Sequence, residues 1–116
     1  TVKVLLSEHN ANLEAKDNND STPLHIACLK GHYDTVKVLL SGEHNANLEA
    51  KSTNDWTPLH VACLAGQLDI MLLLLQAGAN TKARDINDDT PVRIANKYKH
   101  PVIARRLLEE AMKTKR

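Results

Sequence analysis

The chain has 116 residues, enough for one domain, and its formal net charge is +1, which gives no basic surplus for binding nucleic acid or an acidic membrane. Its hydrophobic content of 42% is typical of a folded protein, but aromatic residues make up only 3%, so the core must be aliphatic. The longest apolar run, Ile70 to Leu75, is far shorter than the roughly 20 residues of a membrane-spanning helix.

An internal repeat organises the whole chain. The sequence at residues 22–25, Thr-Pro-Leu-His, recurs at residues 57–60, and Thr-Pro-Val-Arg follows at residues 90–93. Residues 1–34 align with residues 35–69 when Gly42 is treated as an insertion, and 27 of the 34 aligned positions are identical. A period of this length is typical of stacked structural units.

Each unit is expected to contain two short helices. Thr22 is a favourable N-cap, Pro23 suits the first helical position, and Gly31 is expected to end the helix in the left-handed conformation. Asp34 then begins a second helix, on the favourable side of its dipole. The apolar stripe of this second helix consists of Val36, Leu39 and Leu40. Two such helices cannot bury their own apolar faces, so they must stack on a neighbouring unit.

Polar segments connect the helix pairs. An Asn-Asp pair occurs at residues 19–20, 54–55 and 87–88, shortly before each Thr-Pro. Because Asn and Asp tolerate positive φ, each pair predicts a tight chain reversal. The unit is therefore a hairpin-like finger followed by helix, turn and helix.

These features resemble the ankyrin-repeat family, whose signature is Thr-Pro-Leu-His-x-Ala. The signature is matched at residues 22–27 and 57–62, Gly31 and Gly66 match the turn between helices, and residues 39–40 and 74–75 match the second helix. The resemblance covers essentially the whole chain. It implies an all-α repeat fold, an ankyrin-type α-solenoid of helix–turn–helix units joined by β-hairpin-like finger loops. Tetratricopeptide repeats have a similar period, but their Trp-x-x-Leu-Gly-x-x-Tyr pattern is absent.

We expect a single domain. It is either a fragment of a longer array or an array that naturally begins with a half-repeat, whose apolar surface another element must then cover. Its parts are a half-repeat 1–14, a repeat 15–49, a repeat 50–82 and a C-terminal capping repeat 83–116. The last unit departs from the pattern, because Arg93 replaces the signature histidine and Lys99 replaces the turn glycine. A terminal repeat needs a polar outer face, which fits these changes.

The sequence contains no pattern for catalysis or cofactor binding. Phosphate-binding, nucleophile-elbow and zinc-protease motifs are all absent. Cys28 and Cys63 are too few for a disulfide framework and are expected to be small buried side chains. The family resemblance implies that His25 and His60 are structural hydrogen-bonding residues. We therefore expect no enzyme, no cofactor and no metal site.

Stacked units leave a concave face made of finger tips and first helices, the surface that this architecture usually offers to proteins. Trp56 is the most specific indication there, because the equivalent residues are Ser21 and Asp89. Tryptophan is common in interface hot spots, but Trp56 could instead pack on a neighbouring finger. On the other side, Leu72 stands where Lys37 and Arg105 stand in the neighbouring units and could be an outer contact. The candidate partner-binding residues are Asn18, Ser21, Leu29, Lys30, Thr53, Trp56, Leu64, Ala65, Ile86 and Asp89.

Three functions follow from this interpretation. The first is a protein–protein interaction module that binds a protein or peptide through its concave face, as a monomer without chemistry of its own. The second is a structural spacer or scaffold segment within a larger protein. The third, a small-molecule binder or enzyme, is suggested only by the six histidines and two cysteines. Without a signal peptide or membrane span, we expect an intracellular protein, cytoplasmic or nuclear.

Overall fold

The computed structural model describes residues 21–41 and 46–113, which form six α-helices and one 3₁₀ helix and contain no strand. The half-repeat predicted over residues 1–14 lies outside them. The helices are α2 (Pro23–Lys30), α3 (Tyr33–Leu39), α4 (Pro58–Ala65), α5 (Leu68–Gln76), α6 (Pro91–Lys97) and α7 (Pro101–Lys113), with the 3₁₀ helix η1 at Thr53–Asp55.

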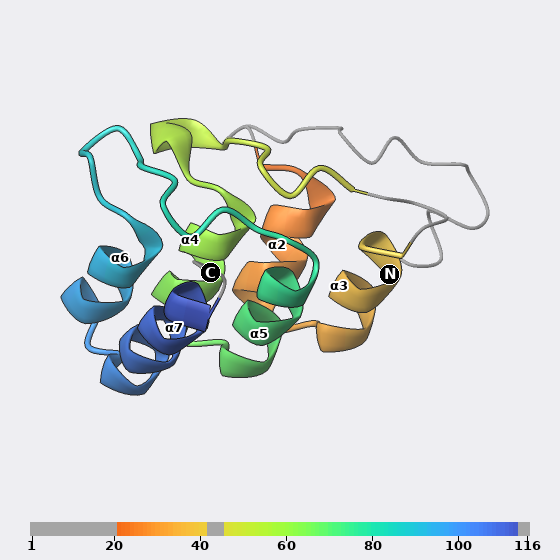
Figure 1. Cartoon of the computed structure of the whole chain (residues 1–116). Helices are drawn as coiled ribbons and strands as arrows, with labels where there is room; N and C mark the ends of the chain where they lie inside the picture. The colour runs from red at the N-terminus through yellow and green to blue at the C-terminus, as the bar shows by residue number, and fades with distance from the viewer. Residues whose placement is uncertain (1–20, 42–45, 114–116) are drawn as a thin grey trace.

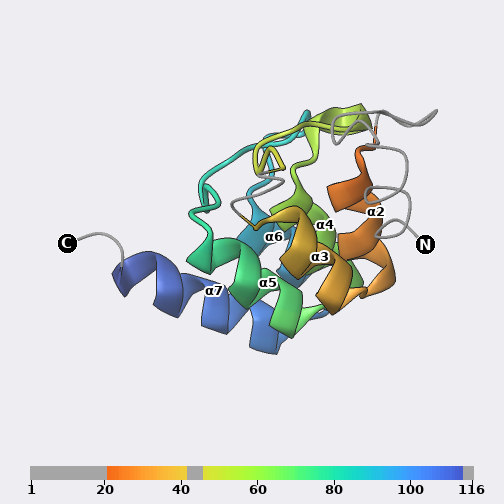
Figure 2. The ribbon, with the colours of Figure 1, turned by 90° about the vertical axis from the view of Figure 1, so that its right-hand side faces the viewer.

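The six helices lie in two layers (Figures 1 and 2). Helices α2, α4 and α6 are neighbours in the inner layer, and α3, α5 and α7 are neighbours in the outer layer. The segments that join one helix pair to the next run along one edge of both layers, at the top of both views. This arrangement confirms the predicted all-α repeat fold.

The three inner helices begin in the same way. Thr22, Thr57 and Thr90 have extended backbone angles, and each hydroxyl accepts a hydrogen bond from the backbone N–H three residues later. Proline follows each threonine at the first helical position, where its missing N–H costs nothing. The predicted N-caps are thus confirmed in all three units.

The turns between paired helices use the left-handed conformation. Gly31 and Gly66 both have φ of 75°, as predicted, and Lys99 adopts φ of 65° at the equivalent position without being glycine. Helix α3 begins at Tyr33, one residue before the predicted start at Asp34. Asp34 still lies in the first turn, where its charge favours the helix dipole.

The core lies between the two layers and is aliphatic, as the composition indicates. Cys28 and Cys63 are fully buried within it, which confirms their predicted role as small packing residues. The largest buried apolar side chains in the described residues are Leu24, Leu39, Leu59, Ile70, Met71, Leu74, Ile94 and Leu107. They come from all six helices, so each unit contributes to a core continuous with that of its neighbour.

Candidate functional site

The two fingers that the structure describes close by the same backbone hydrogen bond. The N–H of Ser52 donates to the carbonyl of Trp56 at 2.9 Å, and the N–H of Asp85 donates to the carbonyl of Asp89 at 3.0 Å. Positive φ angles occur at Asn54 and, in the second finger, at Asp88, so the Asn-Asp pairs of these two fingers make the predicted reversals, and the pair at residues 19–20 lies outside the described residues. The finger tips also touch, because the N–H of Ile86 donates to the carbonyl of Asn54 at 2.9 Å.

Trp56 joins one finger to the next. Its indole Nε1–H donates to Oδ2 of Asp85 at 2.8 Å, and its ring lies nearly parallel to that of His60 with the ring centres 6.3 Å apart. The side chain is partly buried, and it packs against the core. The structure therefore shows the packing of Trp56 on a neighbouring finger that we named as one alternative. The exposed part of the ring stays available for contact with a partner, which is the other alternative.

Asp85 is the partner that the sequence analysis missed. Only 6% of this residue is exposed, and Oδ1 accepts hydrogen bonds from the N–H groups of Asn87 and Asp89, both at 2.8 Å. Burial by itself would raise the pKa of Asp85, but the hydrogen bonds from Asp89, Trp56 and Asn87 outweigh it and lower the pKa. An Asp placed two residues before an Asn-Asp pair is a sequence signal for such an Asx turn.

His25 in α2 and His60 in α4 each form a hydrogen bond to the following finger. Nδ1 of each ring accepts from the backbone N–H of its N-cap threonine, at 3.1 and 3.2 Å. The proton must then reside on Nε2, which donates to the carbonyl of Trp56 at 2.7 Å from His25 and to the carbonyl of Asp89 at 2.9 Å from His60. These bonds confirm the structural role that the family resemblance implies. Burial lowers the pKa of His60, which favours the neutral ring that this geometry needs.

The predicted partner-binding residues of the inner helices share one register. Leu29 is 49% exposed at the end of α2, followed by exposed Lys30. Leu64 and Ala65 hold the equivalent positions of α4 and are partly exposed.

The remaining predicted residues lie in the fingers. Ser21 is partly exposed and Thr53 is exposed, whereas Ile86 is 66% exposed near the tip of its finger. Asn18 lies outside the described residues. The structure thus brings the finger residues Thr53, Trp56 and Ile86 close together and leaves Leu29 and Leu64 as a separate row on the helices.

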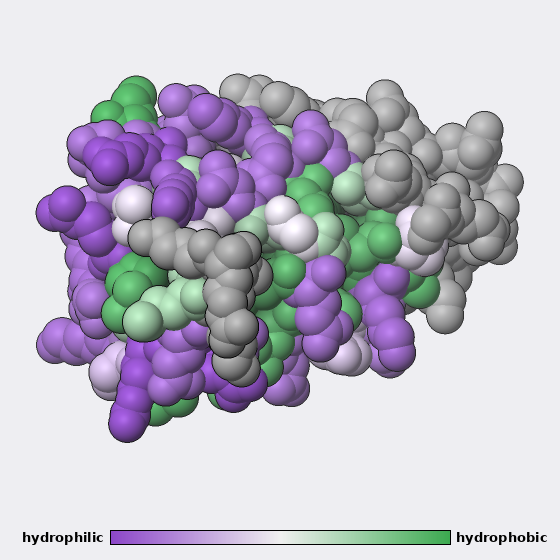
Figure 3. Space-filling view, viewed as in Figure 1, coloured by the Kyte–Doolittle hydropathy of each residue, from purple (hydrophilic) through white to green (hydrophobic). Residues whose placement is uncertain are grey.

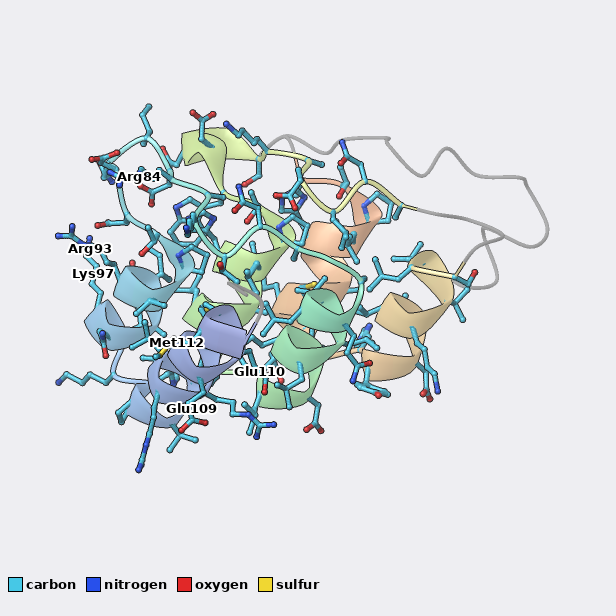
Figure 4. The ribbon with its side chains drawn as sticks, in the orientation of Figure 1. Arg84, Arg93, Lys97, Glu109, Glu110 and Met112 are labelled. Carbon is cyan, nitrogen blue, oxygen red and sulfur yellow. The ribbon has the colours of Figure 1, made fainter. Side chains whose placement is uncertain are left out.

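Unlike the other finger residues, Asp89 forms ion pairs with two cations. Its side chain is 13% exposed and lies 3.4 Å from Nε of Arg93 and 3.7 Å from Nζ of Lys97. Both cations are well exposed, and Figure 4 shows them near Arg84 at the same end of the stack. Arg93 and Lys97 were not predicted as site residues. The sequence does indicate them, because Arg93 replaces the signature histidine and Lys97 replaces the leucine of the other units.

The described residues hold no group of three His, Cys, Asp or Glu side chains that could bind a metal ion. Burial raises the pKa of the Cys28 and Cys63 thiols to about 12, so neither is a reactive thiolate near neutral pH. None of the helices in the described part of the chain is long and apolar enough to cross a membrane. The arrangement offers surfaces for recognition.

The family model for ankyrin repeats (3 copies) matches the chain twice, over residues 1–85 and 44–116, so that the two matches together cover all of it. No curated protein matches closely enough to count as a relative. Ankyrin repeats generally serve as non-catalytic protein–protein interaction modules. Signature, fold and model match agree, and the chain belongs to the ankyrin-repeat family.

Proposed function

We propose that this chain binds a protein or peptide partner across the concave face formed by the fingers and the inner helices α2, α4 and α6. The observation that carries the proposal is a row of equivalent positions: Leu29 in α2, Leu64 in α4 and Lys97 in α6. The fold does not need leucine at this position, because α6 has lysine there. Leu29 is nevertheless an exposed apolar side chain, which is what a binding surface requires.

The row changes in character along the stack. It is apolar in α2 and α4 and becomes cationic in α6, where Arg93 adds a second exposed charge one turn earlier. Asp89 neutralises only part of this charge, since one carboxylate faces two cations. A partner with apolar side chains over α2 and α4 and an acidic group over α6 would complement this face.

Trp56 contributes to the same face in a fixed orientation. Its indole N–H is already bound to Asp85, so the ring cannot rotate freely. An aromatic side chain held in this way loses little conformational entropy on binding, which favours a role as an anchor.

Affinity capture from a cell lysate with the intact chain, read by mass spectrometry, tests the proposal. Leu29→Glu should remove the captured partner, because it places a charge in the apolar part of the row. Leu108→Glu is the matched control, since Leu108 is 50% exposed but lies on α7 in the outer layer. Equal capture by both variants would show that the concave face does not bind. A structural spacer, the second function expected from the sequence, would capture nothing with any variant.

A further inference from the structure

The outer face of α5 is unusually apolar for a surface helix. Seven of its nine residues are Leu, Ile or Met, and only Ile70, Met71 and Leu74 of these are buried. The exposed parts form the hydrophobic area at the centre of Figure 3. In the equivalent position to Leu72, α3 has Lys37 and α7 has Arg105, both exposed. Leu72 packs in part against the core, but the fold accepts a charge at this position, so core packing does not by itself require a leucine there.

Leu72 borders a hollow between α5 and α7, which we name the α5–α7 hollow. Helix α7 has 13 residues against nine in α5 and runs past the end of α5 (Figure 2), and its Arg106 and Glu110 line the hollow. The volume is about 600 Å³, within the range of ligand and peptide pockets. The hollow is lined by Leu72, Leu75, Gln76, residues 78–82, Arg106 and Glu110.

The lining of the hollow combines apolar side chains, which we name its floor, with polar and charged side chains, which we name its rim. Leu72, Leu75 and Ala79 supply the apolar side chains. A smaller hollow of about 270 Å³ lies on the other side of α5 and also includes Leu72 and Gln76. Leu72 thus forms part of a ridge between two depressions, a shape into which the side chains of another helix can interlock.

The charges on the rim favour an acidic occupant. Arg106 and Glu110 neutralise each other through an ion pair of 3.1 Å, and Figure 4 shows Glu110 at the boundary between α7 and α5. Lys82 is exposed and has no ion-pair partner among the residues that the structure describes. The hollow therefore keeps one positive charge beside an apolar floor.

We propose that the α5–α7 hollow is a second docking site, which binds an amphipathic helix of another protein. Apolar side chains one turn apart on this helix enter the hollow over Leu72 and Leu75, and a carboxylate beside them faces Lys82. A second copy of this chain fits less well. Its own α5 offers leucines beside the exposed cations Lys37 of α3 and Arg105 of α7, which do not complement the positive charge of Lys82.

The site lies in the outer layer, whereas the concave face lies over the inner layer (Figure 2). The two sites share no lining residue, so one chain could hold two partners at once. The proposal is therefore independent of the concave-face function and can succeed or fail separately from it.

A phage-displayed library of helical peptides of about 14 residues, roughly four turns, tests the proposal. Selection is made on the intact chain, with the Leu72→Lys variant as counter-target. Leu72→Lys should keep the fold, because α3 carries Lys37 at the same position, and a cooperative thermal melt with helical circular dichroism verifies this. Enriched peptides are expected to carry apolar residues one turn apart beside Asp or Glu.

The enriched peptide is then titrated by fluorescence anisotropy. Leu72→Lys should weaken binding about tenfold or more, the loss of one buried apolar contact. Lys82→Glu should favour a peptide in which lysine replaces the acidic residues. Leu29→Glu, on the concave face, should leave the affinity unchanged.

Four results would overturn the proposal. They are no enrichment over the counter-target, enriched peptides that are basic, binding lost with Leu29→Glu, and sedimentation that shows a dimer dissociated by Leu72→Lys. The last result would assign the hollow to a second copy of this chain.

Discussion

Replacing Trp56 by phenylalanine isolates the contact between the two fingers. The aromatic ring stays, but the donor to Oδ2 of Asp85 at 2.8 Å is lost. Hydrogen bonds to charged groups contribute about 1.5–3 kcal/mol. Because Trp56 is only partly buried, the lower end applies, and we expect the free energy of unfolding to fall by about 1.5 kcal/mol at pH 7. A domain of this size should then melt about 6 °C lower.

The loss should depend on pH. The native contacts lower the pKa of Asp85, so the stability that they provide is present above about pH 4, the unfolded pKa, and is lost as the pH falls through the native pKa. Urea unfolding followed by circular dichroism at pH 7 and pH 2.5 measures the difference. Asp85→Asn in a double-mutant cycle with Trp56→Phe isolates the pair energy. If Trp56→Phe and the wild type unfold alike at pH 7, the hydrogen bond does not stabilise the fingers.

Three further predictions concern the framework. Gly31→Ala and Gly66→Ala are a matched pair, since both glycines have φ of 75° and an added Cβ would lie 2.8 Å from a side chain of the next unit. Gly66→Ala should lower the melting temperature more, because it displaces His100, whose ring is bound to the Leu64 carbonyl at 3.0 Å. The Gln67 amide opposite Gly31 can instead move away. Equal melting temperatures of the two variants would refute this. Burial lowers the pKa of His60, so urea unfolding should show stability that is full above about pH 6.5 and falls as the pH drops below it, with a weaker dependence in His60→Gln. Cys28 and Cys63, with pKa values of about 12, should react with iodoacetamide at pH 8 only after unfolding, and rapid labelling of the folded chain would contradict their burial.

Features determined by a few neighbouring residues could be predicted from the sequence. Thr22 and Thr57 cap helices, and Gly31 and Gly66 turn the chain, because hydroxyl hydrogen bonding and positive φ are local properties of those residues. The 35-residue recurrence then placed the units in order. Lys99 shows the limit of this reasoning, since it adopts the left-handed angle without being glycine. Its backbone follows the turn that the stacked helices impose.

Contacts between units could not be predicted in the same way. Trp56 and Asp85 are 29 residues apart, and their hydrogen bond exists only because stacking brings successive fingers together. The ion pairs of Asp89 with Arg93 and Lys97 lie within one unit, and Asp89–Arg93 joins residues only four apart. The α5–α7 hollow is lined by side chains of α5 and α7 and by residues 78–82, which only stacking brings together, and Leu72 was the only part of it that the sequence indicated.

The side chains that join the units differ from those that both proposed sites use, with Trp56 as the exception. Among the described residues, unit-to-unit hydrogen bonds come from the side chains of His25, His60, His100, Trp56 and Glu49, and from backbone groups of the fingers. The exposed Leu29 and the partly buried Leu72 make none of these hydrogen bonds, and other units have lysine or arginine in their place. Substituting Leu29 should therefore change the free energy of unfolding by no more than about 0.5 kcal/mol, whereas Leu72, which also packs against the core, should cost more. A repeat array built in this way can vary its inner and outer surfaces separately, and Trp56 is the one residue for which loss of binding and loss of stability must be measured together.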